Sequence, residues 1–501
     1  MKKSKILALL LSASLVASAA SGCSNSSSSS NASPTSGSGK EAPYTVNFMY
    51  LSPGTQKDQQ AVDDAINALT MKELNMKVNI IPMSLGSYQQ KLQLMLSGGE
   101  PLDLFPMMPN DVESFKANGY LDDMGPLIDK YGKNINKLFG TDAKMGNMNG
   151  FVFDVTMMKE WENPVGFVMR TDIVKKCGID VSKIKSLDDM TAVFAKVKAQ
   201  YPSMAALVGG KDNNPVELMH VFDDLGDGFG VLTNYGQNTN VVNWYGTDEF
   251  AHYCKLVRQW YLAGYVKKDM PTTTDGIESQ IRAGNAFCGM GNLKPNTKAE
   301  KDSMCNMDTT IVPITKTYRT TTSFGCFGYS IAHNSQDPAK AMQFLDWTYG
   351  NAEFNNLLNW GLEGKHYVFT DKTNKIISFP QGMNIGNDPY HIDYGWAIPN
   401  QFIANIWTGN DPKIWDTYKT FNDGALKSKA YGFYYDSSKL TTQISQLTSV
   451  TSKYLNGLGS GSVDPDTTIP KLNQDLKAAG LDTVMAEKQK QLSAWLAKTN
   501  K

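Results

Sequence analysis

The chain has 501 residues, and its 48 basic and 49 acidic side chains leave a formal charge of −1. This length exceeds what one hydrophobic core can organise, so we expect two or more lobes. No basic cluster is interleaved with aromatic residues, which excludes nucleic acid as a partner. After residue 22, no apolar run approaches the length of a membrane-spanning helix.

The first 22 residues have the pattern of a secretory signal peptide. Lys2, Lys3 and Lys5 precede an apolar core at residues 6–16, which is too short to span a bilayer. Ala-Ser-Gly-Cys at residues 20–23 resembles the bacterial lipobox, in which the cysteine becomes the lipidated first residue. We therefore expect cleavage before Cys23 and an anchor on the extracellular face of the cell membrane. Ala20 departs from the usual leucine, so plain secretion is the alternative.

Residues 23–42 are expected to form a disordered tether behind the lipidated cysteine. They consist almost entirely of Ser, Asn, Gly, Thr and Pro, which cannot bury enough surface to fold. Removing the three leader lysines lowers the formal charge from −1 to −4. A flexible tether is useful only when something upstream of it is anchored.

A regular alternation of strands and helices follows the tether. Apolar runs at 44–51, 77–83 and 102–107 predict buried strands, and helical spacing of apolar residues predicts helices over 61–73 and from Tyr88 to Gly98-Gly99. This β-α-β-α-β order predicts parallel strands with right-handed crossovers. Ligands of such sheets bind beyond the carboxyl ends of the strands, here residues 52–54, 83–84 and 107–110.

The same residues resemble a known family. YTVNFMYLSPGT and KVNIIPMSLGSYQQKLQLMLSGGEPLDLF are similar to the opening of the family 1 extracellular solute-binding proteins of bacterial ABC importers, most closely the sugar-binding lipoprotein branch. The resemblance continues through VGFVMRTDIVKKCGIDVSKIKSLDDM, LVRQWYLAGYVKKD, NWGLEGKHYVF and AEKQKQLSAWL. It implies a two-lobed α/β fold of the type II periplasmic-binding-protein class. Each lobe would be a mostly parallel sheet flanked by helices, with hinge crossings and a helical C-terminal segment.

The resemblance also sets the expected lobe boundaries. We assign residues 43–158 and about 322–372 to the first lobe, and residues 159–321 and about 373–501 to the second. The first crossing is expected near residues 158–165, and the return crossing in the segment TTTSFGCFGYSIAHNS at 320–335.

A carbohydrate site is expected between the lobes, where carboxylates and amides would take sugar hydroxyls and indoles would stack on ring faces. Core packing is the alternative explanation for each tryptophan. The predicted ligand-binding residues are Ser52, Met108, Glu160, Trp161, Asn163, Trp244, Lys294, Glu363 and Trp396.

Metal and disulfide signals are weak. The acidic turn at 223–228 looks like a calcium loop but lacks the downstream bidentate glutamate, so we expect a plain turn, no metal and no cofactor. Beyond Cys23 the odd number of cysteines leaves at least one thiol unpaired, and buried free thiols are the expected state. A bridge between Cys288 and Cys305 is the alternative for an exported protein.

The sequence contains no HExxH zinc motif and no GxSxG nucleophile elbow. The remaining enzymatic alternative is an exported glycan hydrolase, which needs two facing carboxylates from among Glu160, Glu162, Glu363 and Asp393. We instead expect a monomeric, non-enzymatic, lipid-anchored protein that delivers a carbohydrate, in particular an oligosaccharide, to an ABC transporter permease. A receptor for peptides or another polar solute is the alternative within binding proteins.

Overall fold

The computed structural model describes residues 42–108, 111–162, 164–211, 213–325 and 327–499. Residue contacts divide the chain after Ala42, and the unit Pro43–Lys501 holds every described helix and strand. Cys23, the tether before Ala42 and Asn163 lie outside the described residues. None of the described helices is both long and apolar enough to cross a membrane.

The first sheet has five strands in the spatial order β2-β1-β3-β12-β6. These strands are β1 (Tyr44–Leu51), β2 (Met76–Met83), β3 (Leu104–Pro106), β6 (Val155–Thr156) and β12 (Gly328–Ile331). β1 pairs in parallel with β2 along its whole length, and with β3 on its other side. The predicted β-α-β-α-β order is confirmed.

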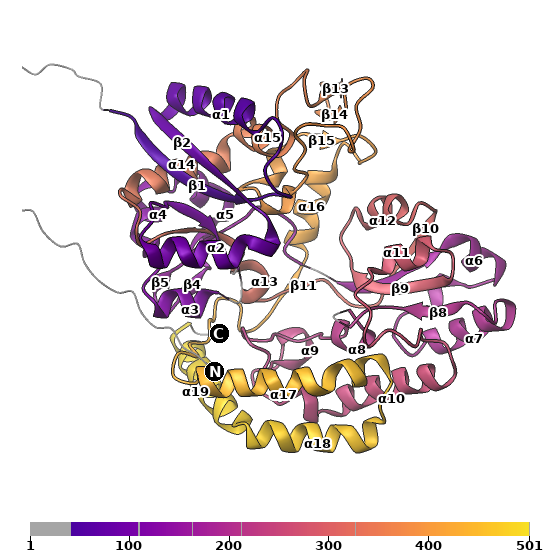
Figure 1. Ribbon diagram of the computed structural model, residues 1–501. Helices are drawn as coiled ribbons and strands as arrows, with labels where there is room; N and C mark the ends of the chain where they lie inside the picture. Colours follow the sequence, from indigo (N-terminus) through magenta and orange to yellow (C-terminus); the bar gives the residue numbers. More distant parts are fainter. Residues whose placement is uncertain (1–41, 109–110, 163, 212, 326, 500–501) are drawn as a thin grey trace, which may run out of the picture. The chain divides into compact units, whose positions relative to one another are not determined.

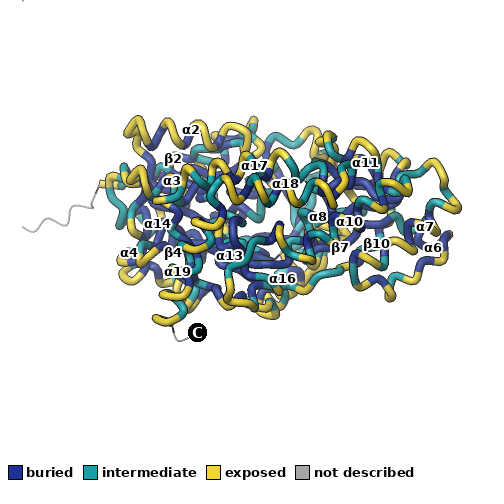
Figure 2. Tube along the Cα trace, turned by 90° about the horizontal axis from the view of Figure 1, so that it is seen from below, coloured by how far each residue is buried: buried dark blue, intermediate teal, exposed yellow. Residues whose placement is uncertain are grey.

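Helices α1 (Gln59–Leu74) and α2 (Leu85–Gly98) connect these parallel strands. The chain moves from β1 to β2 and then back past β1 to β3, so right-handed crossovers place the two helices on opposite faces of the sheet (Figure 1). α2 buries Tyr88, Leu92, Met95 and Leu96 and exposes most of its other residues (Figure 2). It ends at Gly99, whose φ of 68° favours glycine.

The first core is completed by helices that come from two distant parts of the chain. They are α3 (Val112–Ala117), α4 (Gly125–Tyr131), α5 (Lys133–Phe139), η1 (Gly140–Lys144), α13 (Thr321–Gly325), α14 (Pro338–Gly350) and α15 (Ala352–Trp360). Phe344 and Phe354, from α14 and α15, both contact Phe48 of β1 at ring-centroid distances of 5.6 and 6.0 Å. Residues after 320 therefore return to the sheet on which the chain began.

The second sheet has the order β10-β7-β9-β8. Its strands are β7 (Val165–Arg170), β8 (Ala205–Val208), β9 (Ala286–Asn292) and β10 (Thr309–Pro313). The helices from this part of the chain are α6 (Thr171–Lys176), η2 (Val181–Lys183), α7 (Met190–Gln200), α8 (Pro215–Leu218), α9 (Thr233–Gly236), η3 (Trp244–Gly246), α10 (Asp248–Leu262), α11 (Ile277–Arg282) and α12 (Thr297–Cys305).

The C-terminal helices belong to this second core. α17 (Thr441–Ser460), α18 (Pro465–Ala478) and α19 (Leu481–Thr499) follow one another, and α17 and α18 lie beside α10 (Figure 1). Leu481, Val484 and Leu492 of α19 are buried in the second core. Their helical spacing in the sequence predicts this buried face.

The expectation of mostly parallel sheets is wrong in detail, although the two-lobed α/β class holds. In the first sheet β12 runs antiparallel to β3 and β6, and in the second sheet β7 runs antiparallel to β9 and β10. Gly328 starts β12 beside Thr156, the last residue of β6. The returning chain thus enters at the carboxyl ends of the other strands, which forces the antiparallel direction.

Short strands and helices fill the remaining chain. They are β4 (Asn147–Met148), β5 (Phe151–Val152), β11 (Tyr318–Arg319), β13 (Val368–Asp371), β14 (Ile376–Ser378), β15 (Ile406–Trp407), β16 (Leu426–Lys427), η4 (Gly395–Ala397), η5 (Gln401–Ile403) and α16 (Ile414–Asp423). Cys177, Cys254, Cys288 and Cys305 are buried free thiols, so the alternative bridge between Cys288 and Cys305 does not form.

Residues 390–404 pack in the first core, although we expected the chain after about residue 373 in the second lobe. Buried asparagines of α15 hold this segment by its backbone. The side-chain oxygens of Asn359, Asn355 and Asn356 accept hydrogen bonds from the backbone N–H groups of Tyr394, Asn400 and Asn405 at 2.9, 3.1 and 2.7 Å. Amide side chains add no hydrophobic pattern, so the sequence does not reveal this docking.

Three of the segments that pass between the two cores meet in one cluster of side chains. They run between Trp161 and Val165, between Val312 and Phe324, and between Ala404 and Ala430. Glu162 of the first segment forms an ion pair with Arg319 of the second, and Arg319 also donates to the backbone oxygen of Asn422 in the third. We call Trp161, Glu162, Arg319 and Asn422 the crossing cluster.

Candidate functional site

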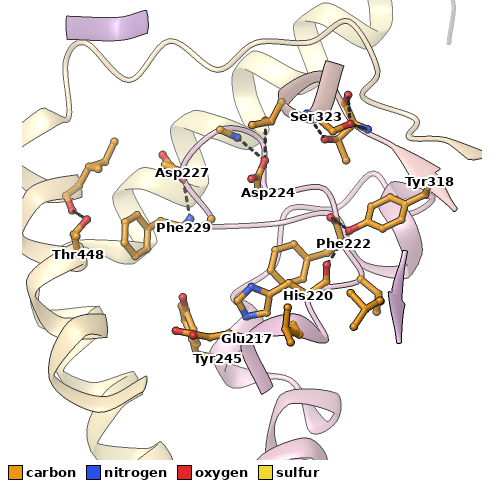
Figure 3. A pocket seen from close by; sticks show the side chains of 18 of the residues that line it. Glu217, His220, Phe222, Asp224, Asp227, Phe229, Tyr245, Tyr318, Ser323 and Thr448 are labelled. Carbon is orange, nitrogen blue, oxygen red and sulfur yellow. Dashed lines mark hydrogen bonds between the residues drawn. The ribbon is translucent and has the colours of Figure 1, made fainter. Parts of the chain in front are cut away.

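A cavity of about 880 Å³ is lined by residues from both cores (Figure 3). Aromatic rings, carboxylates and hydroxyl groups dominate its wall. Its polar and aromatic lining residues include Glu113, Glu217, His220, Phe222, Asp224, Asp227, Phe229, Tyr245, Tyr318, Thr322, Ser323, Tyr434, Ser437 and Thr448.

One loop, residues 220–229, supplies much of the wall. Asp223, Asp224 and Asp227 each accept a hydrogen bond from the backbone N–H two residues ahead, at 3.0, 3.0 and 2.8 Å. Aspartate favours such tight turns because its short side chain mimics the turning backbone. The turns fix the direction in which the carboxylates of Asp224 and Asp227 face.

Aromatic residues form a packed group at one side of the cavity. His220 stacks on Phe222 with centroids 4.9 Å apart, and both rings contact Trp244 behind them. Burial lowers the pKa of His220 to about 4, so the imidazole is neutral at physiological pH. The hydroxyl of Tyr318 donates to the backbone oxygens of His220 and Phe222 at 2.8 and 3.2 Å, which holds the loop.

Two carboxylates reach the cavity from opposite cores. Glu113 lies on α3 of the first core and accepts a hydrogen bond from the backbone N–H of Ser437 at 3.3 Å. Burial raises the pKa of Glu113 to about 7, with smaller contributions from nearby acidic groups. Glu217 lies on α8 and accepts from the side-chain amide of Asn214 at 2.7 Å.

The C-terminal segment forms a further part of the wall. Ser437 is 1% exposed, lines the cavity, and has a hydroxyl oxygen without a hydrogen-bond partner among the described residues. Lys488 of α19 is fully buried, forms an ion pair with Asp227, and donates to the backbone oxygen of Gly230 at 3.2 Å. The last helix of the chain therefore supports the acidic loop from behind.

No group of three His, Cys, Asp or Glu side chains within the described ranges is arranged to hold a metal ion. In the turn at 223–228, one oxygen of each of the three aspartates accepts a backbone N–H, as described above. Asp224 also accepts from the hydroxyl of Thr322 at 2.9 Å. These contacts explain the acidic pattern as a set of turns.

The structure brings two of the predicted charged residues, Glu160 and Lys294, together, and neither lines this cavity. The ammonium of Lys294 lies 3.4 Å from Glu160 and 2.9 Å from Glu300, and Lys294 lines a separate cavity of about 910 Å³ with Pro164 and Phe421. Both charges are therefore engaged with protein partners.

The other predicted residues are spread over the two cores. Trp161 is 6% exposed, Ser52 is fully buried and Trp244 is 1% exposed. Met108 and Trp396 pack against the first core and are partly buried. Glu363 is on the surface, 3.2 Å from Lys372. Among the predicted residues that the structure describes, none lines the 880 Å³ cavity, and Trp244 touches its lining from behind.

Sequence reasoning missed the residues that line the cavity. Glu113 lies in a six-residue helix with no distinctive motif, and Ser437 lies in a stretch without regular structure. The one available signal was the density of Asp and Gly at 223–228, which we interpreted as a turn without a role in a site. A long glycine-rich and acidic loop after a buried aromatic pair is the pattern that could have indicated a binding loop.

The fold and this cavity are those of a protein that encloses a solute between two lobes. The family "Bacterial extracellular solute-binding protein" matches residues 53–353, and the chain belongs to this family. A second match, to a domain of unknown function (DUF3502), covers residues 429–497.

Similar proteins cover most of the chain. A carbohydrate ABC transporter substrate-binding protein of Streptococcus pneumoniae serotype 4 is 26% identical over 435 residues, which are 86% of this chain and 87% of that protein. The crystal structure of the N-glycan transport solute-binding protein NgtS from Streptococcus pneumoniae is 24% identical, covers 91% of this chain and 100% of its own, and superposes with a TM-score of 0.80. The structure of the substrate-binding protein FusA of S. pneumoniae in complex with kestose is 15% identical to this chain. The match covers 91% of this chain and 100% of FusA, with a TM-score of 0.61.

Proposed function

We propose that this protein captures a carbohydrate, in particular an oligosaccharide, in the 880 Å³ cavity and delivers it to the permease of an ABC transporter. The observation that carries the proposal is the composition of the cavity wall, which combines aromatic rings with carboxylates and hydroxyl groups from both cores. Ligand binding across two lobes would favour a closed arrangement for the permease to recognise.

The chemistry of the wall suits sugars. Sugar hydroxyls donate to carboxylates, and these charge-assisted hydrogen bonds are stronger than neutral ones. The apolar faces of pyranose rings pack on aromatic side chains such as Tyr318 and Tyr434. A volume of about 880 Å³ lies near the upper end of ordinary ligand pockets, which supports a ligand of more than one sugar ring.

The similar proteins support the same ligand class. NgtS has been crystallised with Man1GlcNAc and with Man5GlcNAc, at 23% identity to this chain in both cases. Both glycans are ligands of NgtS. They supply a rational starting set for testing this one.

A bulky substitution in the wall should block binding. Thr448 on α17 is exposed and lines the cavity, so Thr448→Trp would fill part of it without disturbing a core. We expect at least a roughly tenfold loss of affinity, equal to about 1.4 kcal/mol, for the best glycan of a calorimetric panel of mannose- and N-acetylglucosamine-containing oligosaccharides.

The neighbouring residue provides the matched control. Ser449 is also exposed on α17 but does not line the cavity, so Ser449→Trp should bind as the wild type does. Equal affinity of both variants and the wild type would move the site elsewhere. Recovery of hydrolysed sugar that depends on Glu160 or Glu363 would favour the alternative of an exported glycan hydrolase.

We also propose attachment to the outer face of the cell membrane through a lipid on Cys23. Two acyl chains from a diacylglyceryl unit would hold the protein stably, whereas one chain would not. In cells, Cys23→Ala should release the protein into the medium or leave it unprocessed, as fractionation and N-terminal mass spectrometry would detect. A mature wild-type chain that starts at another residue would contradict the anchor.

A further inference from the structure

The charge of the cavity wall carries information about the ligand. Four carboxylates line it, from Glu113, Glu217, Asp224 and Asp227, whereas no lysine or arginine among the described residues does so. An acidic wall with no facing cation is unusual for a site that must bind anions, because recognition of carboxylate or sulfate relies on Arg and Lys. The wall therefore bears on which sugars can enter.

The cations near the wall do not reverse its charge. The ammonium of Lys488 lies behind the acidic loop and is engaged by Asp227 and the backbone oxygen of Gly230. His220 is neutral at physiological pH because burial lowers its pKa to about 4. Of the wall carboxylates, Asp227 is offset by Lys488, whereas Asp224 is hydrogen-bonded to neutral partners, Gly226 and Thr322.

A separate observation indicates that the wall is built for a ligand. Ser437 is 1% exposed and lines the cavity, yet its hydroxyl oxygen has no partner within the described part of the chain. A buried hydroxyl without a partner costs stability, so native proteins satisfy nearly all of them. A sugar hydroxyl in the cavity would supply that partner.

We propose, on the basis of the carbohydrate function above, that the ligand is an oligosaccharide without anionic groups and that the acidic wall rejects sugars bearing carboxylate or sulfate. Neutral hydroxyls donate to the wall carboxylates, and an ammonium would pair with them. An anionic sugar would meet like charges in a cavity where the low dielectric strengthens the repulsion.

Three forms of one disaccharide test this proposal. They are mannosyl-N-acetylglucosamine, the same disaccharide with the mannose C6 oxidised to a carboxylate, and the same disaccharide with an amine at that carbon. Calorimetry at pH 7.5 and low salt should show the carboxylate form binding at least roughly tenfold more weakly than the neutral form, which is about 1.4 kcal/mol. The amine form should bind as tightly as the neutral form or more tightly.

A variant that removes one wall charge tests whether the acidic wall causes the preference for neutral sugars. Asp224→Asn keeps an oxygen that can accept from Gly226 and Thr322 but removes one negative charge. It should therefore reduce the ratio of the affinity for the neutral form to the affinity for the carboxylate form at least threefold. Asp188→Asn changes the net charge equally at an exposed site that pairs with His252 and does not line the cavity. This control should keep the wild-type ratio.

The outcomes separate this inference from the proposed function. Equal binding of the neutral and carboxylate forms, or a ratio that Asp224→Asn leaves unchanged, would overturn the inference and leave a carbohydrate receptor. Failure of all three forms to bind would count against carbohydrate capture itself, and the inference would fall with it.

Discussion

The crossing cluster and the cavity contain similar residue types but satisfy them differently. In the crossing cluster, fully buried Glu162 faces the guanidinium of Arg319, and that guanidinium lies 4.8 Å from the ring of Trp161. In the cavity, carboxylates outnumber nearby cations, and the hydroxyl of Ser437 has no partner among the described residues. The ion pair of Glu162 with Arg319 supports the fold, although burial still raises the pKa of Glu162 to about 7. In the cavity, by contrast, no lysine or arginine among the described residues lines the wall.

The largest effect is expected in the crossing cluster. Arg319→Met would leave the charge of Glu162 buried without its cation and should lower the free energy of unfolding by about 3–5 kcal/mol in urea denaturation. The double variant Arg319→Met with Glu162→Gln should recover part of the loss, since it removes the orphaned charge. A loss below about 1 kcal/mol in the single variant would show that the two regions do not differ as we describe.

Trp161 tests the same region through packing. Its indole is 6% exposed, donates to the backbone oxygen of Met157 at 2.9 Å, and lies 4.6 Å from the ring of Phe324. We expect Trp161→Ala to cost about 3–5 kcal/mol of stability and to leave glycan affinity per folded molecule unchanged.

The partly buried Trp396, which stacks on Phe327 at 5.5 Å, is the matched tryptophan outside the crossing cluster. Trp396→Ala should cost only about 0.5–1.5 kcal/mol. If Trp161→Ala weakened binding while the melting temperature held, the indole would belong to the ligand site that the sequence predicts.

A smaller, pH-dependent effect is expected for Glu113 in the cavity. Burial raises its pKa from 4.5 to about 7, so the folded protein holds the proton more tightly than the unfolded chain. Stability contributed by this group is therefore present at low pH and falls as the pH rises between about 4.5 and 7. Because the residue is only partly buried, we expect Glu113→Gln to be more stable than wild type by roughly 1–3 kcal/mol at pH 8 and to lose that advantage near pH 4.

Thermal melts of both proteins across this pH range measure the difference. Glu100→Gln, at an exposed position before β3, is the control and should follow the wild type at every pH. Parallel curves for wild type and Glu113→Gln would contradict the raised pKa of this carboxylate.

The sequence by itself determined the elements whose pattern is local and periodic. The strands β1, β2 and β3, the buried faces of α1, α2 and α19, and the stop at Gly99 follow from hydrophobic spacing and glycine conformation, which act within a few residues. Family likeness, carried by several segments in one order, supplied the two-lobed class. These features need no knowledge of distant contacts.

Only the tertiary structure decided the antiparallel entry of β12, the docking of residues 390–404 and the location of the cavity. Each depends on partners far apart in the chain: Asn355 holds Asn400, Glu113 reaches Ser437, and Lys488 supports Asp227. The local sequence around a tryptophan or glutamate does not show whether its side chain packs inside the protein or contacts a ligand. Trp161 contacts Arg319 and Glu160 contacts Lys294, and the place of both residues in a ligand site stays a prediction.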